Sequence, residues 1–455
     1  MKKLITLLII TTFLTISHAQ PVPLAGKGFI KNIAGMPGKR AFSGDKEDAL
    51  RARLANPSGI AVDRFHNIYI ADTNNHRIRR VDARSGYIET IAGNGRIDFF
   101  SDGGNADMTS LRGPSGLAID EEHGFLFVAD AGHHRVRMIT LKNYPDMVLQ
   151  DNDPMKRWAF AQIATPDDMS DEEVASFHIP RGYIYTVAGN GRAGYEGEGA
   201  QAIASSLNGP SAVAISPAGE LYISDTDNHR IRKIDRNTGK LITVVGNGEP
   251  GDSGDSGLAV NARLYYPTDI AFDKQGNLFI SDTGNNKIRV VEHRSQRIFT
   301  IAGDGKRGYM GDNTGRSVDA RFNHPTGLAM DSKGRIYVSD TDNQRIRRIS
   351  IDFERRQTRI ETVVGNGRRG YNGEDINAWD AKLAYPSGIT ITPRDMLYIT
   401  DSGNNLIRRV EGISTIHVPT TYTDYSAAAT EPQDNRSYYD VLYKPQVEAA
   451  EKKGS

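Results

Sequence analysis

The chain contains no cysteine in its 455 residues. This absence excludes disulfide bonds, thiolate metal sites and cysteine nucleophiles. The chain must draw its stability from a large hydrophobic core, because no covalent cross-link contributes. A chain of this length can bury such a core, since the buried fraction of the surface rises with chain size.

The chain also lacks net charge. Its 56 Lys and Arg residues are balanced by 56 Asp and Glu residues, so the formal charge is zero. Binding to nucleic acid or to an anionic membrane draws on a strongly basic surface, and the composition contains no such surplus. We therefore expect no nucleic-acid partner.

Long apolar runs are missing except for one near the N-terminus. Lys2 and Lys3 precede an apolar run over residues 4–16, which is interrupted only by threonine, and small residues follow up to Ala19. This pattern indicates a secretory signal peptide over residues 1–19. The run is shorter than the roughly 20 residues of a membrane span, although an uncleaved anchor is the alternative. We expect a secreted or periplasmic protein without a transmembrane segment.

One short motif, by contrast, occurs six times. Its first copy lies at residues 71–79, where an Asp is followed three residues later by Asn and seven residues later by Arg. The Asp recurs as Asp72, Asp130, Asp225, Asp282, Asp340 and Asp401. The Arg recurs as Arg79, Arg137, Arg232, Arg289, Arg347 and Arg408. Such self-similarity indicates a repeat architecture.

Each repeat predicts four short β-strands. In the first repeat, a Pro-Ser-Gly entry leads into a strand at residues 57–62, and a turn leads to a second strand at 68–71. The Asp motif precedes a third strand, and a fourth ends in glycine at residues 91–95. Strands of about five residues joined by local turns form an antiparallel meander.

The two ends of the repeat region complement each other. Residues 29–35 copy a fourth strand and stand alone before the first repeat, whereas the sixth repeat stops at residue 410 without a fourth strand. The N-terminal strand is therefore expected to complete the last blade, which closes the ring and removes exposed strand edges. We predict an all-β fold, a six-bladed β-propeller of four-stranded antiparallel blades over residues 28–412.

The repeat resembles that of the NHL family. The pattern Pro-x-Gly-x-Ala-x-Asp is followed by Tyr-Ile-Ala-Asp-Thr-x-Asn-His-Arg-Ile-Arg, and the Asn-His pair of this pattern falls at Asn75 and His76. The glycine-rich loop at residues 370–375 is similar to the longer subtype found in exported bacterial NHL proteins and in the teneurin propeller. The resemblance covers nearly all of the chain between the signal peptide and the tail.

We interpret the repeated Asp and Arg as structural. An Asp at the start of a turn can accept hydrogen bonds from backbone N–H groups two residues further on. The Arg of the third strand is expected to balance its charge. Six equivalent copies argue against catalysis, because an active site is a single place.

Candidate ligand contacts lie where the six repeats converge. The loops between blades are long, with basic outer ends and acidic, glycine-rich middles, and loops of about 15 residues are presumed functional. The residue after each entry proline is expected to place a hydroxyl at the mouth of the central channel. These residues are Ser58, Ser115, Ser211, Thr268, Thr326 and Ser387. Such a ring could hold a glycan, a peptide or an anion, and the alternative is that the hydroxyls only cap backbone groups.

Two residues near the mouth depart from the repeat. Asp269 stands where other repeats have Gly or Ala, and His324 precedes Pro325 where other repeats have Asn, Gly or Tyr. A carboxylate near a propeller axis could bind a cation or act as a base.

An exported lyase or hydrolase with a divalent ion at the channel mouth is the alternative function. The peptidyl-hydroxyglycine amidating lyase is an NHL-type propeller with a zinc site built from histidines. Here His76, His134 and His229 share one repeat position in three separate blades. Packed sheets lie roughly 10 Å apart, whereas zinc needs its ligands about 2 Å from one point. We expect no cofactor; calcium in the acidic loops is a candidate, although no loop has the Asp-x-Asp-x-Asp-Gly spacing.

Two segments interrupt or follow the repeats. Residues 141–181 insert between the third and fourth strands of the second blade, and residues 413–455 form a low-complexity tail that we expect to be disordered. We predict an exported binding scaffold without its own catalysis, which takes a protein or glycan partner on the face of the long loops. The sequence does not indicate the oligomeric state.

Overall fold

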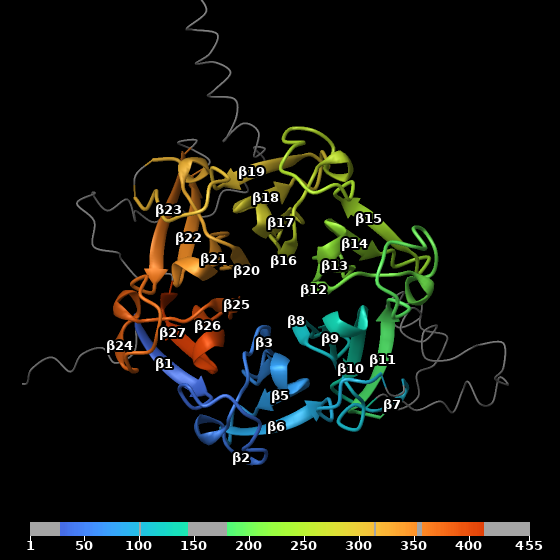
Figure 1. The fold of residues 1–455 in the computed structure, drawn as a ribbon, viewed down its shortest axis with the longest axis vertical. Coiled ribbons are helices and arrows are strands. Elements are labelled where there is room, and N and C mark those ends of the chain that lie inside the picture. The colour runs from blue at the N-terminus through green and yellow to red at the C-terminus, as the bar shows by residue number, and fades with distance from the viewer. Residues whose placement is uncertain (1–27, 100–101, 144–179, 314, 353–356, 414–455) are drawn as a thin grey trace, which may run out of the picture.

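Six antiparallel sheets stand around a central axis and form a six-bladed β-propeller (Figure 1). The computed structural model describes residues 28–99, 102–143, 180–313, 315–352 and 357–413. No α-helix occurs in these ranges. The predicted fold class is confirmed. The proposed signal peptide, most of the insert at 141–181 and almost all of the tail lie outside the described residues.

The first three blades follow one another along the chain, each running from an inner to an outer strand. Blade 1 consists of β3 (Ile60–Val62), β4 (Ile68–Asp72), β5 (Arg77–Val81) and β6 (Tyr87–Ala92). Blade 2 consists of β8 (Pro114–Asp120), β9 (Phe125–Asp130), β10 (Arg135–Thr140) and β11 (Tyr183–Ala188). Blade 3 consists of β12 (Pro210–Ile215), β13 (Leu221–Asp225), β14 (Arg230–Ile234) and β15 (Leu241–Val245).

The last three blades complete the ring. Blade 4 consists of β16 (Pro267–Phe272), β17 (Leu278–Asp282), β18 (Lys287–Val291) and β19 (Ile298–Ala302). Blade 5 consists of β20 (Pro325–Met330), β21 (Ile336–Asp340), β22 (Arg345–Asp352) and β23 (Gln357–Val364). Blade 6 consists of β25 (Pro386–Ile391), β26 (Met396–Asp401), β27 (Leu406–Glu411) and β1 (Phe29–Ala34).

The N-terminal strand closes the ring, as the sequence predicts. Strand β1 pairs antiparallel with β27, and Ile30 lies opposite Val410. Figure 1 shows the blue strand β1 beside the red strand β27. Ile30 is fully buried in a core cluster with Leu397 and Val410, so closure buries apolar surface as well as pairing a strand edge.

The hydrophobic core lies between blades. The second strand of each blade is almost entirely buried, as in β4, because its alternating side chains reach neighbouring sheets on either side. Ile78 of blade 1 and Val128 of blade 2, for example, belong to one buried cluster. Neighbouring blades are therefore held together by apolar packing around the ring.

The long loops differ from their predicted position. We expected them on one face, but they run down the outer edge of the following blade, where Glu47 pairs with Ile88 and the Ala49 N–H donates to the Gly86 carbonyl. Three loops form an added fifth strand there: β2 (Glu47–Asp48), β7 (Gly104–Asn105) and β24 (Ile376–Asn377). The physical reason is that an outermost strand leaves unpaired backbone groups, which the loop covers.

Short 3₁₀ turns occupy two repeated places. One set follows each second strand: η2 (Thr73–Asn75), η3 (Ala131–His133), η6 (Thr226–Asn228), η8 (Thr283–Asn285), η10 (Thr341–Asn343) and η12 (Ser402–Asn404). The other set lies in the long loops: η1 (Ala49–Arg51), η5 (Ala202–Ala204), η7 (Ala259–Asn261), η9 (Ser317–Asp319) and η11 (Ala378–Asp380). The first set faces the channel mouth and therefore positions the candidate site.

Candidate functional site

The repeated Asp and Arg form buried ion pairs, one in each blade. In blade 3, Arg232 lies 3.1 Å from Asp225, and both side chains are fully buried. The other five pairs have the same arrangement at 3.1 to 3.5 Å. The predicted charge balance is confirmed.

The hydrogen bonds of the Asp differ from the predicted turn. Asp72 accepts from the N–H of Ala55, which lies 17 residues earlier at the end of the long loop, and from the amide of Asn75. The equivalent backbone bonds recur in the other blades at 2.7 to 2.8 Å. The expected acceptance from N–H groups two residues on is wrong, because the carboxylate points back to the incoming loop. This Asp therefore fastens the loop to the blade.

The acidic middles of the long loops also have a structural role. Asp45 lies 2.7 Å from Arg79, so the buried guanidinium is shared between an Asp of its own blade and an acid of the loop. Asp102, Glu198, Asp255 and Asp312 make the same contact with their arginines, at 2.7 to 2.9 Å. Blade 6 differs, since Arg408 donates to the Gly373 carbonyl instead.

The Asn-His pair of the repeat points to two different partners. Asn75 donates to Asp72 and to the Ala41 carbonyl of the loop, whereas His76 accepts through Nδ1 from the N–H of Gly113 in the next blade. The second contact recurs around the whole ring, with His134, His229, Asn286, Gln344 and Asn405 as acceptors. His, Asn and Gln share this position because each offers an acceptor.

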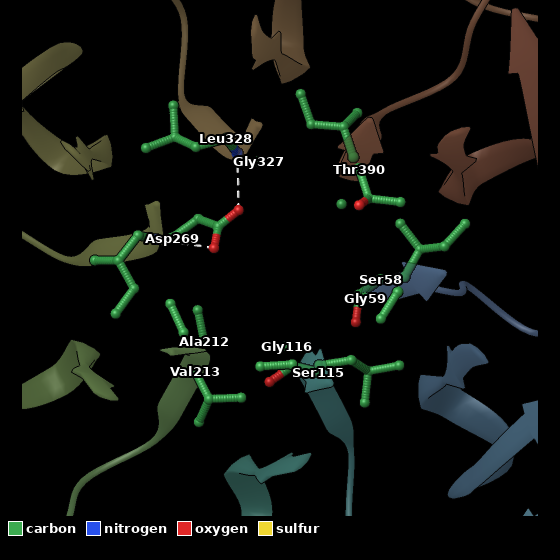
Figure 2. A pocket seen from close by; sticks show the side chains of 18 of the residues that line it. Ser58, Gly59, Ser115, Gly116, Ala212, Val213, Asp269, Gly327, Leu328 and Thr390 are labelled. Atoms are coloured by element: carbon green, nitrogen blue, oxygen red, sulfur yellow. Dashed lines mark hydrogen bonds between the residues drawn. The ribbon is translucent and has the colours of Figure 1, made fainter. Parts of the chain in front are cut away.

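The six hydroxyls predicted at the mouth do line the central cavity. The cavity has a volume of about 470 Å³ and contains all six of Ser58, Ser115, Ser211, Thr268, Thr326 and Ser387 in its wall (Figure 2). Each hydroxyl lies within hydrogen-bond distance of another protein group. Ser211 Oγ, for instance, is 2.7 Å from the carbonyl oxygen of Thr268 in the next blade. The hydroxyls therefore link neighbouring blades around the channel.

The residue after each hydroxyl lies at a tight contact between blades. A Cβ added to Gly59 would lie 1.8 Å from the Ser115 carbonyl oxygen, and one added to Gly388 would lie 2.2 Å from the Ser58 carbonyl oxygen. Blade 4 alone carries a charged residue at this place, Asp269. Its carboxylate accepts from the N–H of Ile270 at 2.8 Å and of Leu328 at 2.7 Å.

Asp269 borders the cavity, with its carboxylate turned toward the channel beside Leu328 (Figure 2). Burial raises the pKa of this carboxyl to about 7, and the two backbone N–H groups only partly oppose the effect. A carboxyl that titrates near neutral pH, set in a cavity, is a feature of functional sites.

The structure does not bring His324 to Asp269. His324 is not part of the cavity wall; its Nδ1 lies 2.5 Å from the carboxylate of Asp342 on the rim. The hypothesis of an Asp and a His acting together in the channel is thus unsupported. Within the described ranges, no three His, Asp or Glu residues are close enough to hold a metal ion.

The residue before the entry proline, which is His324 in blade 5, differs in kind between the two halves of the channel mouth. The residues that precede the six entry prolines are Asn56, Gly113, Gly209, Tyr266, His324 and Tyr385. Each has a positive φ, between 49° and 60°. Blades 1 to 3 fill this left-handed position with Asn or Gly, which tolerate it, and blades 4 to 6 fill it with aromatic rings. We call Tyr266, His324 and Tyr385 the aromatic arc.

The aromatic arc is open to solvent. Tyr266 is 41% exposed and Tyr385 37% exposed. Tyr266 lies against His229 and Tyr265, with ring centroids 4.8 Å away in both cases. Arg369 stacks on Tyr385 and donates to its hydroxyl at 2.8 Å. The aromatic arc is visible in the sequence itself when the residues before the six entry prolines are compared.

Comparison with known proteins identifies the repeats. The NHL repeat family matches residues 111–137, 207–234, 264–291 and 322–349, and the teneurin NHL domain matches residues 31–100. The chain is an NHL-type β-propeller. The matched segments fall on blades 2 to 5 and on the region of blade 1, in agreement with the sixfold contacts described above.

Relatives of this NHL propeller are much larger proteins. It is 28% identical over 331 residues to the Arabidopsis thaliana protein SUPPRESSOR OF QUENCHING 1, covering 70% of this chain and 27% of that protein. It is 27% identical over 408 residues to teneurin-3 of Danio rerio, covering 78% of this chain and 14% of that protein. The chain thus spans less than a third of the length of either relative.

A solved structure shares the fold. An auxiliary nutrient binding protein from Bacteroides thetaiotaomicron superposes with a TM-score of 0.55 at 14% identity, over 84% of this chain and 75% of that chain. Similarity at this level supports the propeller architecture alone. Among the described residues of the NHL propeller, no helix has the length and apolar character to cross a membrane.

Proposed function

We propose that this NHL propeller is an exported binding scaffold without its own catalysis, which takes a protein or glycan partner at the channel mouth. The aromatic arc carries the proposal. In a sixfold frame whose Asp, Arg and Asn contacts are repeated for structural reasons, the arc is a contiguous departure that faces solvent. Binding residues concentrate where a rigid scaffold presents variable positions.

The backbone conformation of the aromatic arc supports a role of its side chains in binding. Bulky residues at positive φ are rare, and such strain costs about 1–3 kcal/mol per residue. Asn56, Gly113 and Gly209 show that the fold works without aromatic rings at this position. The fold therefore does not require three aromatic residues in consecutive blades, whereas exposed tyrosines are common in recognition surfaces.

A substitution set tests the scaffold. Tyr266→Gly, His324→Asn and Tyr385→Asn together give blades 4 to 6 the residue types of blades 1 to 3, so the fold is expected to persist. Phe65→Asn with Tyr87→Asn is the matched control, because these two rings are 64% and 53% exposed. Phe65 lies in the turn between β3 and β4, and Tyr87 is the first residue of β6.

The measurement is binding of purified protein to glycan and peptide arrays, with melting temperature as the folding check. We expect the arc variant to lose array ligands that the unsubstituted protein and the control variant both retain. Equal binding by all three proteins would show that the arc does not recognise the partner.

Export is a separate part of the proposal. It rests on the signal-peptide pattern of residues 1–19, which lies outside the described residues. N-terminal sequencing of the protein from the producing cell tests it, and Gln20 is the expected first residue. A mature chain that retains Met1 would contradict cleavage.

One observation supports the alternative of a lyase or hydrolase with a divalent ion. The carboxylate of Asp269 lies in the channel. Calcium in the acidic loops stays a prediction. Five of the loop acids already contact buried arginines, which reduces the number left for a cation. Metal analysis of the purified protein, combined with its melting temperature with and without a chelator, tests both the divalent ion in the channel and calcium in the loops.

A further inference from the structure

The ring of hydroxyls presents acceptors to the cavity. A hydroxyl has one proton to donate and two lone pairs. Ser115, Ser211 and Ser387 lie 2.8, 2.7 and 3.2 Å from carbonyl oxygens of the next blade. Ser211 and Ser387 also lie 2.5 and 2.7 Å from hydroxyls of their own η turns, so each of these protons has an acceptor within the protein. The other three hydroxyls lie 2.6 Å from a hydroxyl of their own η turn: Ser58 with Thr73, Thr268 with Thr283 and Thr326 with Thr341.

Those η-turn hydroxyls direct their own protons elsewhere. Thr341 Oγ1 lies 2.8 Å from the Pro386 carbonyl oxygen, and Thr283 Oγ1 lies 2.5 Å from that of Pro325. Thr326 and Thr268 are therefore left to donate to these partners rather than to a ligand. The protons of the ring are used within the protein, and lone pairs remain for the cavity.

Asp269 adds a negative charge to this acceptor-rich wall. A carboxylate has about four acceptor positions, and the structure fills two of them with the N–H groups of Ile270 and Leu328. No ion pair involves Asp269 among the described residues, and only backbone N–H groups oppose the effect of burial on its pKa. The carboxylate adjoins the cavity (Figure 2), so its remaining acceptor positions are available there.

The rest of the wall contains no compensating charge. None of the described residues that line the cavity is Lys, Arg or His. Its second carboxylate, Glu121, follows β8 at the far end of that strand and already pairs with Arg64 through the backbone N–H and the guanidinium. Asp269 is thus a partly buried carboxylate without a cationic partner among the described residues. Removing a carboxylate from water in this way is costly unless a partner provides the opposite charge.

We propose that the channel binds a primary ammonium or guanidinium group, held by the carboxylate of Asp269 and by the surrounding hydroxyl and carbonyl oxygens. This inference rests on the binding function proposed above and names the ligand class for the channel. An ammonium group brings three donors and one positive charge, which match a wall of acceptors and one free carboxylate. An anion would meet lone pairs and a negative charge, and a neutral donor would leave Asp269 uncompensated.

A divalent ion fits less well than an organic cation. Calcium takes six to eight oxygen ligands and favours several carboxylates, whereas Asp269 is the one carboxylate in the described wall without a cationic partner. A cavity of this volume lies within the usual range of about 300–1,000 Å³ for small-molecule sites. A free amine and the Lys side chain of a partner share the required chemistry.

The test uses the full-length protein and calorimetric titration at pH 8. The probes are butylammonium, ethylguanidinium and the peptide trilysine, with butanol and butyrate as neutral and anionic controls, and calcium chloride as the metal. The variants are Asp269→Asn, which keeps the shape, and Asp269→Ala, which adopts the residue type of Ala212 in blade 3. Glu121→Gln is the matched control in the same cavity.

We expect the cationic probes to bind, the butanol and butyrate controls not to bind, and both Asp269 variants to bind the cations about tenfold or more weakly, since a charged hydrogen bond is lost. Glu121→Gln should keep the affinity within about threefold. Tight binding of trilysine with no binding of butylammonium would assign the site to a protein side chain, and the reverse would assign it to a free amine.

Other outcomes would overturn the inference. These are the absence of cation binding, an equal loss in Glu121→Gln, or binding of calcium that amines do not displace. If the cations fail to bind while the arc variant still loses its array ligands, the channel inference falls and the proposed scaffold function stands. If the arrays show no ligand but Asp269-dependent amine binding is measured, the scaffold proposal falls instead.

Discussion

His76 of blade 1 accepts a hydrogen bond through Nδ1 from the backbone N–H of Gly113 in blade 2, at 3.1 Å. Five equivalent bonds continue around the ring and end with Asn405 of blade 6, which accepts from Asn56 of blade 1. The position is therefore a latch between neighbouring blades, and any side chain with a well-placed acceptor can serve it.

The latch predicts a difference between two substitutions at one residue. His134→Ala removes the acceptor for the Gly209 N–H and should lower the free energy of unfolding by about 1 kcal/mol. His134→Asn should cost clearly less, because Asn286 serves the same position in blade 4. Urea unfolding of the two variants measures the difference, and equal losses would contradict the latch.

The three histidine latches predict a pH dependence. Burial lowers the pKa of His76, His134 and His229 below the ordinary value of 6.5. The unfolded chain then binds more protons than the folded one, so stability is highest above about pH 6.5 and falls as the pH drops below it. Protonation of Nδ1 would also remove the acceptor.

Urea midpoints at pH 8, 7, 6 and 5 measure this effect. A variant with all three histidines changed to Asn should lose less stability between pH 7 and 5 than the unsubstituted protein, and the difference isolates the histidines from the buried carboxyl groups. Parallel pH profiles would refute the assignment.

The buried ion pairs predict large, non-additive losses. Arg289→Met leaves Asp282 buried without a cation and should cost about 3–5 kcal/mol of folding stability. Adding Asp282→Asn should recover part of that loss, since the uncompensated charge disappears. Asp255→Asn, at the partly exposed end of the same guanidinium, should cost about 1 kcal/mol or less. A double-mutant cycle by urea unfolding separates these contributions.

Ring closure predicts rescue by a separate strand. Deletion of residues 28–35 removes β1, exposes the edge of β27 and opens the cluster around Ile30. We expect aggregation and loss of a cooperative thermal transition. A synthetic peptide of residues 28–36, added during refolding, should restore a monomeric folded protein on size-exclusion chromatography. A deletion variant that melts like the full chain would show that closure is dispensable.

Much of this architecture can be read from the sequence, because it is repeated. Six copies of Asp and Arg at constant spacing define the blades, and the lone copy of a fourth strand at residues 29–35 predicts closure. A pattern that is ambiguous in one segment can be assigned when six segments share it. The ring of hydroxyls at the mouth followed from the same reasoning, since each residue keeps one place relative to its entry proline.

Only the tertiary structure decided which groups remain available to a ligand. Asp72 bonds the N–H of Ala55, His324 is paired with Asp342, and the long loops descend along blade edges. These partners are set by packing between blades and by the demand of every buried polar group for a partner. The local sequence therefore pointed to Asp269 and His324 equally. In the assembled ring His324 pairs with Asp342, whereas Asp269 has no cationic partner in the part of the chain that the structure describes.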